Sequence, residues 1–254
     1  MLVVVSPAKK LNMNQINPMQ ASEPLFKDKA NELAKFVRDL STSGLKNLMG
    51  LSDSLANLNA ERFINFGNQE SKPAAFAFAG DTYQGLDATT LDDDELRWAQ
   101  AHLRILSGLY GILRPLDKIE PYRLEMGSKL KTKNANNLYE YWGKEISNSL
   151  NKDGQITKSS MLINCASKEY FSAINRGTLK LEVITPVFME ETAKGPKVVS
   201  FFAKRARGAM ARFIITRRLT ELNSLKEFDM GGYKYNPEAS DRENPIFVRP
   251  QKDK

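Results

Sequence analysis

Apolar residues follow two spacings along the chain, and each spacing predicts a different kind of element. Leu2–Val5 is a short β-branched run that stops at Ser6-Pro7, which predicts a buried strand. Apolar residues three to four positions apart predict helices at 27–40, 43–49 and 52–66. Phenylalanine alternates with alanine at 74–79, as in a strand. The first third of the chain therefore predicts helices placed between two strands.

The remaining segments mix helices and strands without a regular alternation. Helical spacing surrounds His102 and recurs at 138–150, while the apolar stretch 161–166 predicts a strand followed by a turn or short helix. The later expectations are strands at 179–188 and 197–203, a basic helix at 204–219 and an irregular hairpin ending near 246–248. This mixture predicts an α+β fold, a single compact domain over 1–254 with a central sheet flanked by helices.

Residues 106–127, LSGLYGILRPLDKIEPYRLEMG, concentrate glycine, proline and cations. Two glycines bracket Leu-Tyr after an apolar run with helical spacing, which predicts a helix-hairpin-helix-like element. Backbone N–H groups of such a hairpin contact phosphates without reading bases, and glycine lets a sugar-phosphate backbone come close. The candidate DNA contacts of this segment are Gly108, Leu109, Tyr110, Gly111, Arg114 and Arg123. A plain helix stop is the alternative interpretation of the same residues.

Positive charge is concentrated in one later segment. Between Thr192 and Thr220 there are eight basic residues and no acidic one, although the net charge of the whole chain is only +7. On a helix, Gly208 beside Arg207 predicts an uncovered backbone that a phosphate-bearing partner could approach. The candidate DNA contacts here are Lys204, Arg205, Arg207 and Arg212. A solvated cationic face is the alternative, but exposed helices usually intersperse both signs of charge.

Composition removes several function classes. The only cysteine, Cys165, excludes an intramolecular disulfide and fits a reducing compartment. The only histidine, His102, excludes histidine-rich metal sites, and both residues are expected to be structural. The sequence shows neither a signal peptide nor an apolar run of membrane-spanning length, which predicts a cytoplasmic protein. No cofactor, membrane contact or protein partner is predicted.

A run of acidic residues could suggest a cation site. Asp92, Asp93, Asp94 and Glu95 precede the helix that carries His102. Acidic residues also collect at helix N-termini, and Asp92 with Glu95 has the spacing of a capping box. We therefore predict a helix start here and no metal site.

Several stretches together resemble one known family. They are 6–9 (SPAK), 80–86 (GDTYQGL), 106–127, 164–170 (NCASKEY), 200–210 and 212–215 (RFII). They occur in the order found in the family of the peroxide-stress protein YaaA and cover nearly the whole chain. The resemblance implies a compact mixed fold, a cationic cleft and double-stranded or distorted DNA as ligand through a helix-hairpin-helix element. It also implies a role in surviving hydrogen peroxide, associated with low free intracellular iron and less Fenton damage.

Two hypotheses of different class remain. The first is DNA binding without sequence specificity, in which Lys9 and Lys10 join the cations of the two segments above. The second is an enzyme acting on an anionic small molecule, with Lys9, Tyr122, Arg123 and Lys204 in its pocket. A deep enclosed pocket would favour the enzyme, and an open groove as wide as a duplex would favour DNA.

Overall fold

A central five-stranded sheet organises the structure, a computed structural model that describes residues 1–15 and 21–250. The strand order is β6 (Gly111–Leu113), β5 (Leu103–Ser107), β1 (Leu2–Val5), β8 (Met161–Cys165) and β9 (Glu182–Ile184). Strand β1 runs parallel to β5 and β8, β8 runs parallel to β9, and β6 runs antiparallel to β5. All residues of β1, β5 and β8 are buried, as expected for parallel strands covered on both faces. The strands predicted at Leu2–Val5 and 161–166 are confirmed.

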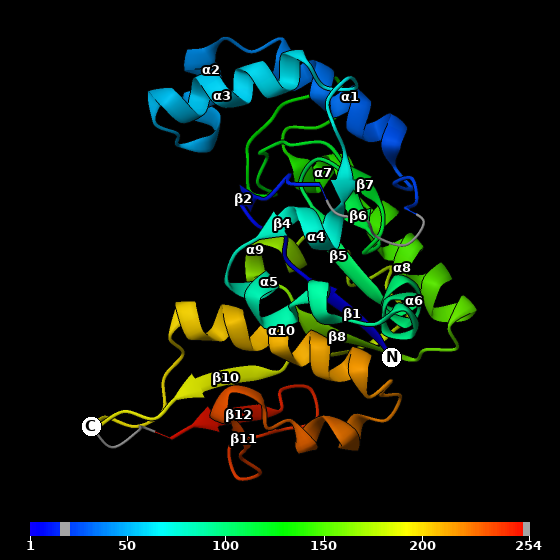
Figure 1. The fold of residues 1–254 in the computed structure, drawn as a ribbon, viewed down its shortest axis with the longest axis vertical. Coiled ribbons are helices and arrows are strands. Elements are labelled where there is room, and N and C mark those ends of the chain that lie inside the picture. The colour runs from blue at the N-terminus through cyan, green and yellow to red at the C-terminus, as the bar shows by residue number, and fades with distance from the viewer. Residues whose placement is uncertain (16–20, 251–254) are drawn as a thin grey trace.

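Helices cover the sheet and extend beyond one end of it. Their bounds are α1 (Lys27–Arg38), α2 (Thr42–Met49), α3 (Asp53–Ile64), α4 (Ala74–Ala77), α5 (Asp81–Leu86), α6 (Asp93–His102), α7 (Leu138–Trp142), α8 (Glu145–Ile156), α9 (Lys168–Phe171) and α10 (Ser200–Thr216). Short 3₁₀ helices are η1 (Ala88–Thr90), η2 (Leu222–Glu227) and η3 (Met230–Gly232). Helices α1, α2 and α3 confirm the three N-terminal predictions and lie together at one end of the molecule (Figure 1).

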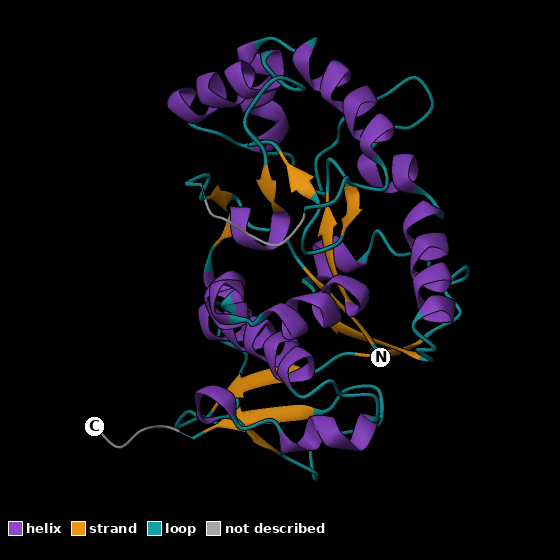
Figure 2. Ribbon diagram, turned by 45° about the vertical axis from the view of Figure 1, so that its right-hand side comes forward, coloured by secondary structure: helices purple, strands orange, loops and turns teal. Residues whose placement is uncertain are grey.

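A small C-terminal sheet occupies the opposite end of the molecule. Strand β12 (Ile246–Arg249) pairs in parallel with β10 (Val187–Glu190) and antiparallel with β11 (Lys234–Tyr235). Two further pairs, β2 (Lys10–Leu11) with β4 (Phe78–Ala79) and β3 (Lys72–Pro73) with β7 (Lys118–Ile119), are short antiparallel ladders. Figure 2 shows the C-terminal strands separated from the rest of the fold by helices.

Helix α10 lies between the central sheet and the C-terminal sheet (Figure 1). It contacts α5, β1 and β8 on one side and β10 and η3 on the other. Glycine permits its close crossing with α5: a Cβ on Gly208 would lie 1.8 Å from the Thr82 carbonyl oxygen, and one on Gly85 would lie 2.0 Å from the Arg205 carbonyl oxygen. The backbone at Gly208 is therefore covered by α5. The prediction that a phosphate approaches there is wrong.

Two predicted strands form helices instead. Residues 74–77 form α4, because Pro73 precedes it and alanine has the highest helix propensity; only Phe78–Ala79 is a strand. The segment 197–203 was expected to be extended, yet α10 begins at Ser200. The predicted helix at 138–150 is divided into α7 and α8, which meet at Gly143 with φ +47°.

The helix-hairpin-helix prediction is also wrong. Helix α6 ends at His102, and the apolar run that follows it forms β5, which pairs with β6 as a β-hairpin. Leu109 and Tyr110 in the turn are buried. A Cβ on Gly108 would lie 2.3 Å from the Leu124 carbonyl oxygen. The glycines therefore fit the turn against neighbouring segments of the protein, and the turn offers no open backbone to a phosphate.

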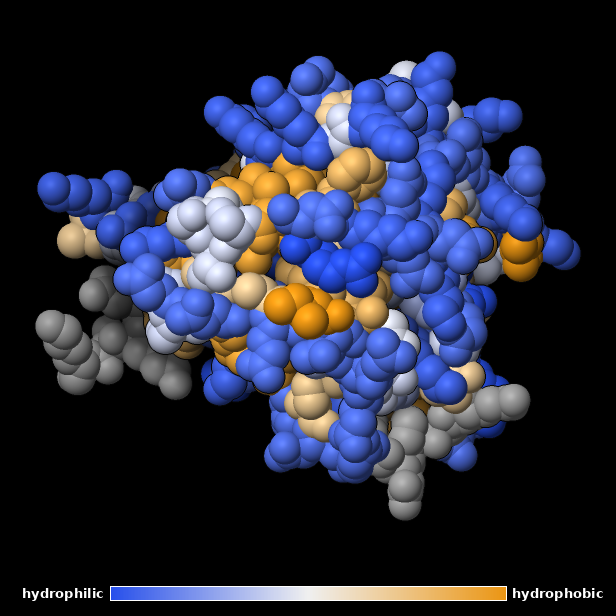
Figure 3. Space-filling view, turned by 90° about the horizontal axis from the view of Figure 1, so that it is seen from above, coloured by the Kyte–Doolittle hydropathy of each residue, from blue (hydrophilic) through white to orange (hydrophobic). Residues whose placement is uncertain are grey.

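One continuous cluster of buried apolar residues runs from Met1 to Phe247, which favours the expectation of one domain. Seen from the α1–α3 end, the surface is mostly hydrophilic, and hydrophobic residues gather near its middle (Figure 3). In the part of the chain that the structure describes, no helix combines the length and apolar character needed to cross a bilayer.

Candidate functional site

Two serines mark the edge at which the parallel strands β1 and β8 end. Ser6 follows β1 directly, and Ser167 is the N-cap of α9, two residues after β8. Ser6 Oγ accepts a hydrogen bond from the Ser167 backbone N–H at 2.8 Å and donates one to Ser167 Oγ at 3.3 Å. Ligands of open α/β sheets commonly bind outside the carboxyl ends of the strands. The serine pair therefore fixes two chain segments at an edge suited to ligand binding.

A cavity of about 450 Å³ lies beside this serine pair, and we call it the basic pocket. Its walls are the segment after β1, the start of α5, the segment after β8 and one face of α10. Lys204 and Arg207 share that helix face because they are three residues apart. Four cations line the pocket: Lys9, Lys10, Lys204 and Arg207. Asp81 and Glu169 add two carboxylates, so positive charge is in excess.

Three of these cations have no acidic partner among the residues that the structure describes. Within residues 1–15 and 21–250, no carboxylate oxygen lies within 4.0 Å of a charged nitrogen of Lys10, Lys204 or Arg207. Both lysines are exposed, whereas Arg207 is largely shielded, and burial lowers the pKa of its guanidinium. Arginine nevertheless stays protonated in proteins. A shielded cation without a partner is unfavourable, so this wall favours a bound anion.

Lys9 connects the basic pocket to a smaller recess. Its Nζ lies 3.3 Å from Glu125 Oε1, and Arg123 Nε donates to the same oxygen at 2.9 Å. The other oxygen, Glu125 Oε2, is buried and has no hydrogen-bond partner among the described residues. Lys9 and Tyr170 line both spaces, while Tyr122, Arg123 and Glu125 line only the recess. Lys9 and Lys204 thus meet in one pocket, and Arg123 lies next to it.

Two buried tyrosines, Tyr122 and Tyr170, line the recess, and a third, Tyr83, lies near them. The Tyr122 and Ser107 hydroxyls are 2.7 Å apart, and the Tyr83 hydroxyl donates to the Ser6 carbonyl oxygen at 3.1 Å. Burial is the main cause that raises the pKa of Tyr83, Tyr122 and Tyr170 far above the usual value. These side chains are therefore neutral phenols at neutral pH. They do not suit the role of a phenolate base, and the Tyr83 hydroxyl already donates its proton to the Ser6 carbonyl oxygen.

Other candidate DNA contacts are not in the basic pocket. Arg114 pairs with buried Asp117 at 2.8 Å, and Arg212 Nη1 donates to the Leu86 and Asp87 carbonyl oxygens at 3.1 and 2.7 Å. Arg205 is exposed on another face of α10 and lines a second cavity. The structure thus brings together Lys9, Lys10, Lys204 and Arg207, and it leaves Arg205, Arg212, Arg114 and the turn Gly108–Gly111 elsewhere.

Sequence reasoning missed Ser6 as a site residue, although its position directly after a buried strand was a usable signal. The pairing of Ser6 with Ser167 spans 161 positions in sequence, so no local pattern predicts it.

The predicted capping box is confirmed, and His102 and Cys165 both occupy structural positions, as expected. Asp92 and Glu95 form the capping box; His102 Nδ1 bonds the Met1 carbonyl oxygen at 3.0 Å; and Cys165 is buried at the pocket floor, where burial raises its thiol pKa to about 12.

Comparisons with known proteins match nearly the whole chain. Residues 1–239 match the family model described as peroxide stress protein YaaA. The chain is 56% identical over 254 residues to a UPF0246 protein of Ruegeria pomeroyi, covering 98% of this chain and 99% of that protein. It is 56% identical over 256 residues to one of Roseobacter denitrificans, covering 98% of each chain. A UPF0246 protein of Phenylobacterium zucineum is 51% identical over 255 residues, covering 99% of this chain and 96% of that protein. The chain therefore belongs to the family of the peroxide stress protein YaaA.

Proposed function

We propose that the protein acts in the peroxide stress response by binding double-stranded or distorted DNA through the basic pocket. The observation that carries this proposal is the meeting of Lys10, Lys204 and Arg207 in one cavity without acidic partners among the described residues. Lys10 and Lys204 are exposed, so they are available to an extended polyanion as well as to a small one. Contacts of this kind are made to phosphate groups and do not distinguish one base from another. The proposed binding therefore has no sequence specificity.

The family resemblance connects this role with iron. It associates the family with low free intracellular iron, and less free iron means less Fenton chemistry at DNA. We propose that DNA binding and this iron effect both limit peroxide damage. The cytoplasm is the compartment in which such a protein would meet DNA and iron in bacteria.

A second candidate is an enzyme acting on an anionic small molecule. Two observations favour it specifically. Glu125 Oε2 is buried without a partner in the described residues, beside Lys9 and the recess, and such a group is a candidate hydrogen-bond or proton acceptor. Arg207 is largely shielded, so it suits a small ligand that enters the cavity better than a duplex that remains outside it.

Fluorescence anisotropy with a labelled duplex and with a duplex that carries an unpaired bubble tests the proposal. Lys204→Gln should weaken binding to unrelated sequences equally, and Arg217→Gln is the matched control. Arg217 lies at the far end of the same helix, outside the basic pocket, and pairs with Glu227 at 3.5 Å. If both variants bind DNA like the unchanged protein, Lys204 makes no DNA contact.

Adding free nucleoside monophosphate separates the two candidates. Under the DNA proposal, Arg207→Gln weakens binding to the bubble duplex, and nucleotide competes only weakly because it offers a single phosphate. Under the enzyme candidate, Arg207→Gln weakens binding of the small anion while DNA binding stays unchanged.

A further inference from the structure

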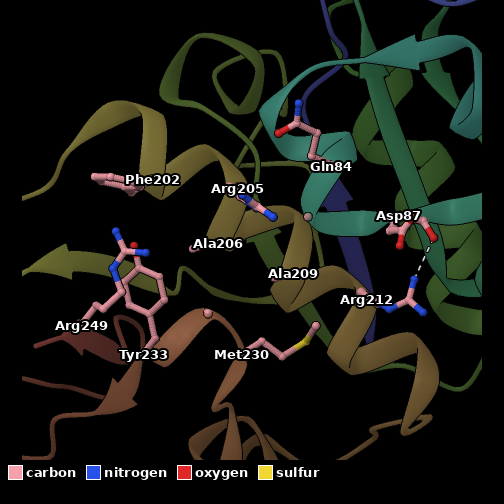
Figure 4. Close-up of a pocket in the computed structure, with 12 residues that line it drawn as sticks. Gln84, Asp87, Phe202, Arg205, Ala206, Ala209, Arg212, Met230, Tyr233 and Arg249 are labelled. Atoms are coloured by element: carbon pink, nitrogen blue, oxygen red, sulfur yellow. Dashed lines mark hydrogen bonds between the residues drawn. The ribbon is translucent and has the colours of Figure 1, made fainter. Parts of the chain in front are cut away.

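A second cavity of about 400 Å³ lies on the other side of α5 from the basic pocket. Helix α5 crosses α10 at Gly208, so Asp81 and Thr82 at its start face the basic pocket, while Gln84 and Gly85 line the second cavity. The opposite wall is η3 with the end of β12 (Figure 4). None of the lining residues of one cavity lines the other. The two spaces are therefore separate sites.

One end of this second cavity carries cations. Arg205 and Arg212 are seven residues apart on α10 and share a helix face. No carboxylate lies within 4.0 Å of either guanidinium in the described parts of the chain. Arg212 is held by the two neutral carbonyl groups at the end of α5, so its position is fixed. The Asp87 carboxylate also lines this cavity, where it accepts hydrogen bonds from the Thr89 and Thr90 hydroxyls. A fixed guanidinium with free N–H donors suits a carboxylate, sulfonate or phosphate group.

The other end of the cavity is flat and aromatic. The Arg249 guanidinium carbon lies 4.2 Å from the ring centre of Phe202 and 5.3 Å from that of Tyr233. Figure 4 shows these three side chains together, apart from Arg205 and Arg212. Arg249 Nε also donates to Glu190 Oε2 at 2.7 Å, so the charge of this arginine is already compensated. The three side chains therefore form a stacking wall.

The floor between the two ends is made of small and flexible apolar residues. Ala206 and Ala209 on α10 are buried, and Met230 faces them from η3. Larger side chains at the alanine positions would fill the space. The size of the cavity, its apolar floor and a few fixed polar groups are the usual features of a small-molecule site.

We propose that this cavity binds a small organic anion with a planar aromatic body, whose acidic group meets Arg205 and Arg212. The aromatic body lies over Ala209 and Met230 toward the Phe202–Arg249–Tyr233 wall. Binding requires no DNA, so this site is independent of the function proposed for the basic pocket.

A matched pair of dyes tests this assignment on the full-length protein. The probes are 8-anilinonaphthalene-1-sulfonate and its uncharged parent N-phenyl-1-naphthylamine, which differ by the sulfonate group. The sulfonate should bind with one-to-one stoichiometry, and Arg205→Gln should raise its dissociation constant about tenfold, equivalent to about 1.4 kcal/mol. The same substitution should leave binding of the uncharged dye unchanged.

Two further variants locate the bound dye. Ala209→Leu should abolish binding of both dyes, while Lys204→Gln, which removes a charge one residue from Arg205 but in the basic pocket, should change neither dissociation constant more than about twofold. Circular dichroism and thermal unfolding check that Ala209→Leu is folded. If Ala209→Leu does not fold, the comparison of Arg205→Gln with Lys204→Gln tests the proposal by itself. Equal affinity for the two dyes, or equal effects of Arg205→Gln and Lys204→Gln, would overturn the proposal.

Discussion

The turn Gly108–Gly111 and the segment Ser6–Lys10 both follow buried strands at the same edge of the central sheet, yet only the segment Ser6–Lys10 lines the basic pocket. Strand β5 ends at Ser107 and β1 ends at Val5, and the two strands are parallel neighbours. The turn after β5 is covered by Trp142 and Leu124 and returns into β6. The segment after β1 faces the basic pocket and carries Lys9 and Lys10 there. What covers a strand end therefore decides its availability to a ligand, and glycine content does not.

The largest effect is expected for a substitution in the covered turn Gly108–Gly111, which should lower the free energy of unfolding. Gly111 has φ +69°, and a Cβ there would lie 2.7 Å from Trp142 Cζ3. We expect Gly111→Val to lower the free energy of unfolding by about 3 kcal/mol or more, because backbone strain and overpacking add. Chemical denaturation measures the loss.

Gly50→Val is the matched control for that substitution. Gly50 has φ +60° at the end of α2, but no atom of the other described residues, its two chain neighbours aside, lies within 4 Å of the position that a Cβ would take there. Its expected cost is about 1–2 kcal/mol, from backbone strain alone. Equal losses for the two variants would show that the Trp142 contact does not hold the turn.

A smaller effect tests whether the floor of the basic pocket is shielded. Cys165 is buried there, and burial raises its thiol pKa to about 12. The thiolate is the reactive form, so hydrogen peroxide at neutral pH should leave Cys165 unmodified in the folded protein and oxidise it after unfolding. Mass spectrometry of the intact protein distinguishes these outcomes. Rapid formation of a sulfenic acid in the folded protein would mean that the floor is open and the thiol is activated.

The smallest expected effect is on the pH dependence of stability, and it concerns His102 at the junction between α6 and Met1. His102 ends α6, bonds the Met1 carbonyl oxygen and stacks on Trp98, and burial is the main cause that lowers its pKa. A depressed histidine pKa means that the unfolded chain binds the proton more readily. The free energy of unfolding should therefore fall as pH drops below about 6.5 toward the lower folded-state pKa.

His102→Gln should weaken that pH dependence, measured by urea denaturation between neutral and mildly acidic pH. An unchanged dependence in this variant would assign the effect to other groups, among them the Met1 amino group, whose pKa burial also lowers.

Much of the local structure follows from the sequence because local interactions determine it. The β-branched run of β1, the amphipathic spacing of α1 and the capping box of α6 were all predicted and are confirmed. Short apolar runs were predicted wrongly. The run before Gly108 was expected to be helical and residues 74–79 to be a strand, but Leu103–Ser107 is a strand and Ala74–Ala77 a helix, because tertiary contacts select the conformation of such runs.

The site was predictable only in part, for the same reason. The charged segment around Lys204 and the strand end at Lys9 were visible as candidates, and the structure brings them into one pocket. The long-range contacts around these residues could not be predicted from the sequence. The contacts of Arg212 with Leu86 and Asp87, of Gly208 with Thr82, and of Ser6 with Ser167 all join residues more than a hundred positions apart.

The central claim is that the cations of the basic pocket contact DNA phosphates, and the salt dependence of DNA binding tests it most directly. A triple variant with Lys10, Lys204 and Arg207 each changed to Gln removes three proposed contacts. If each neutralises one duplex phosphate, the slope of log K against log salt concentration should become less steep by about 2.7, since each contact contributes about 0.9. An unchanged slope and affinity in the folded triple variant would contradict the claim. It would favour the second candidate function, an enzyme that acts on an anionic small molecule.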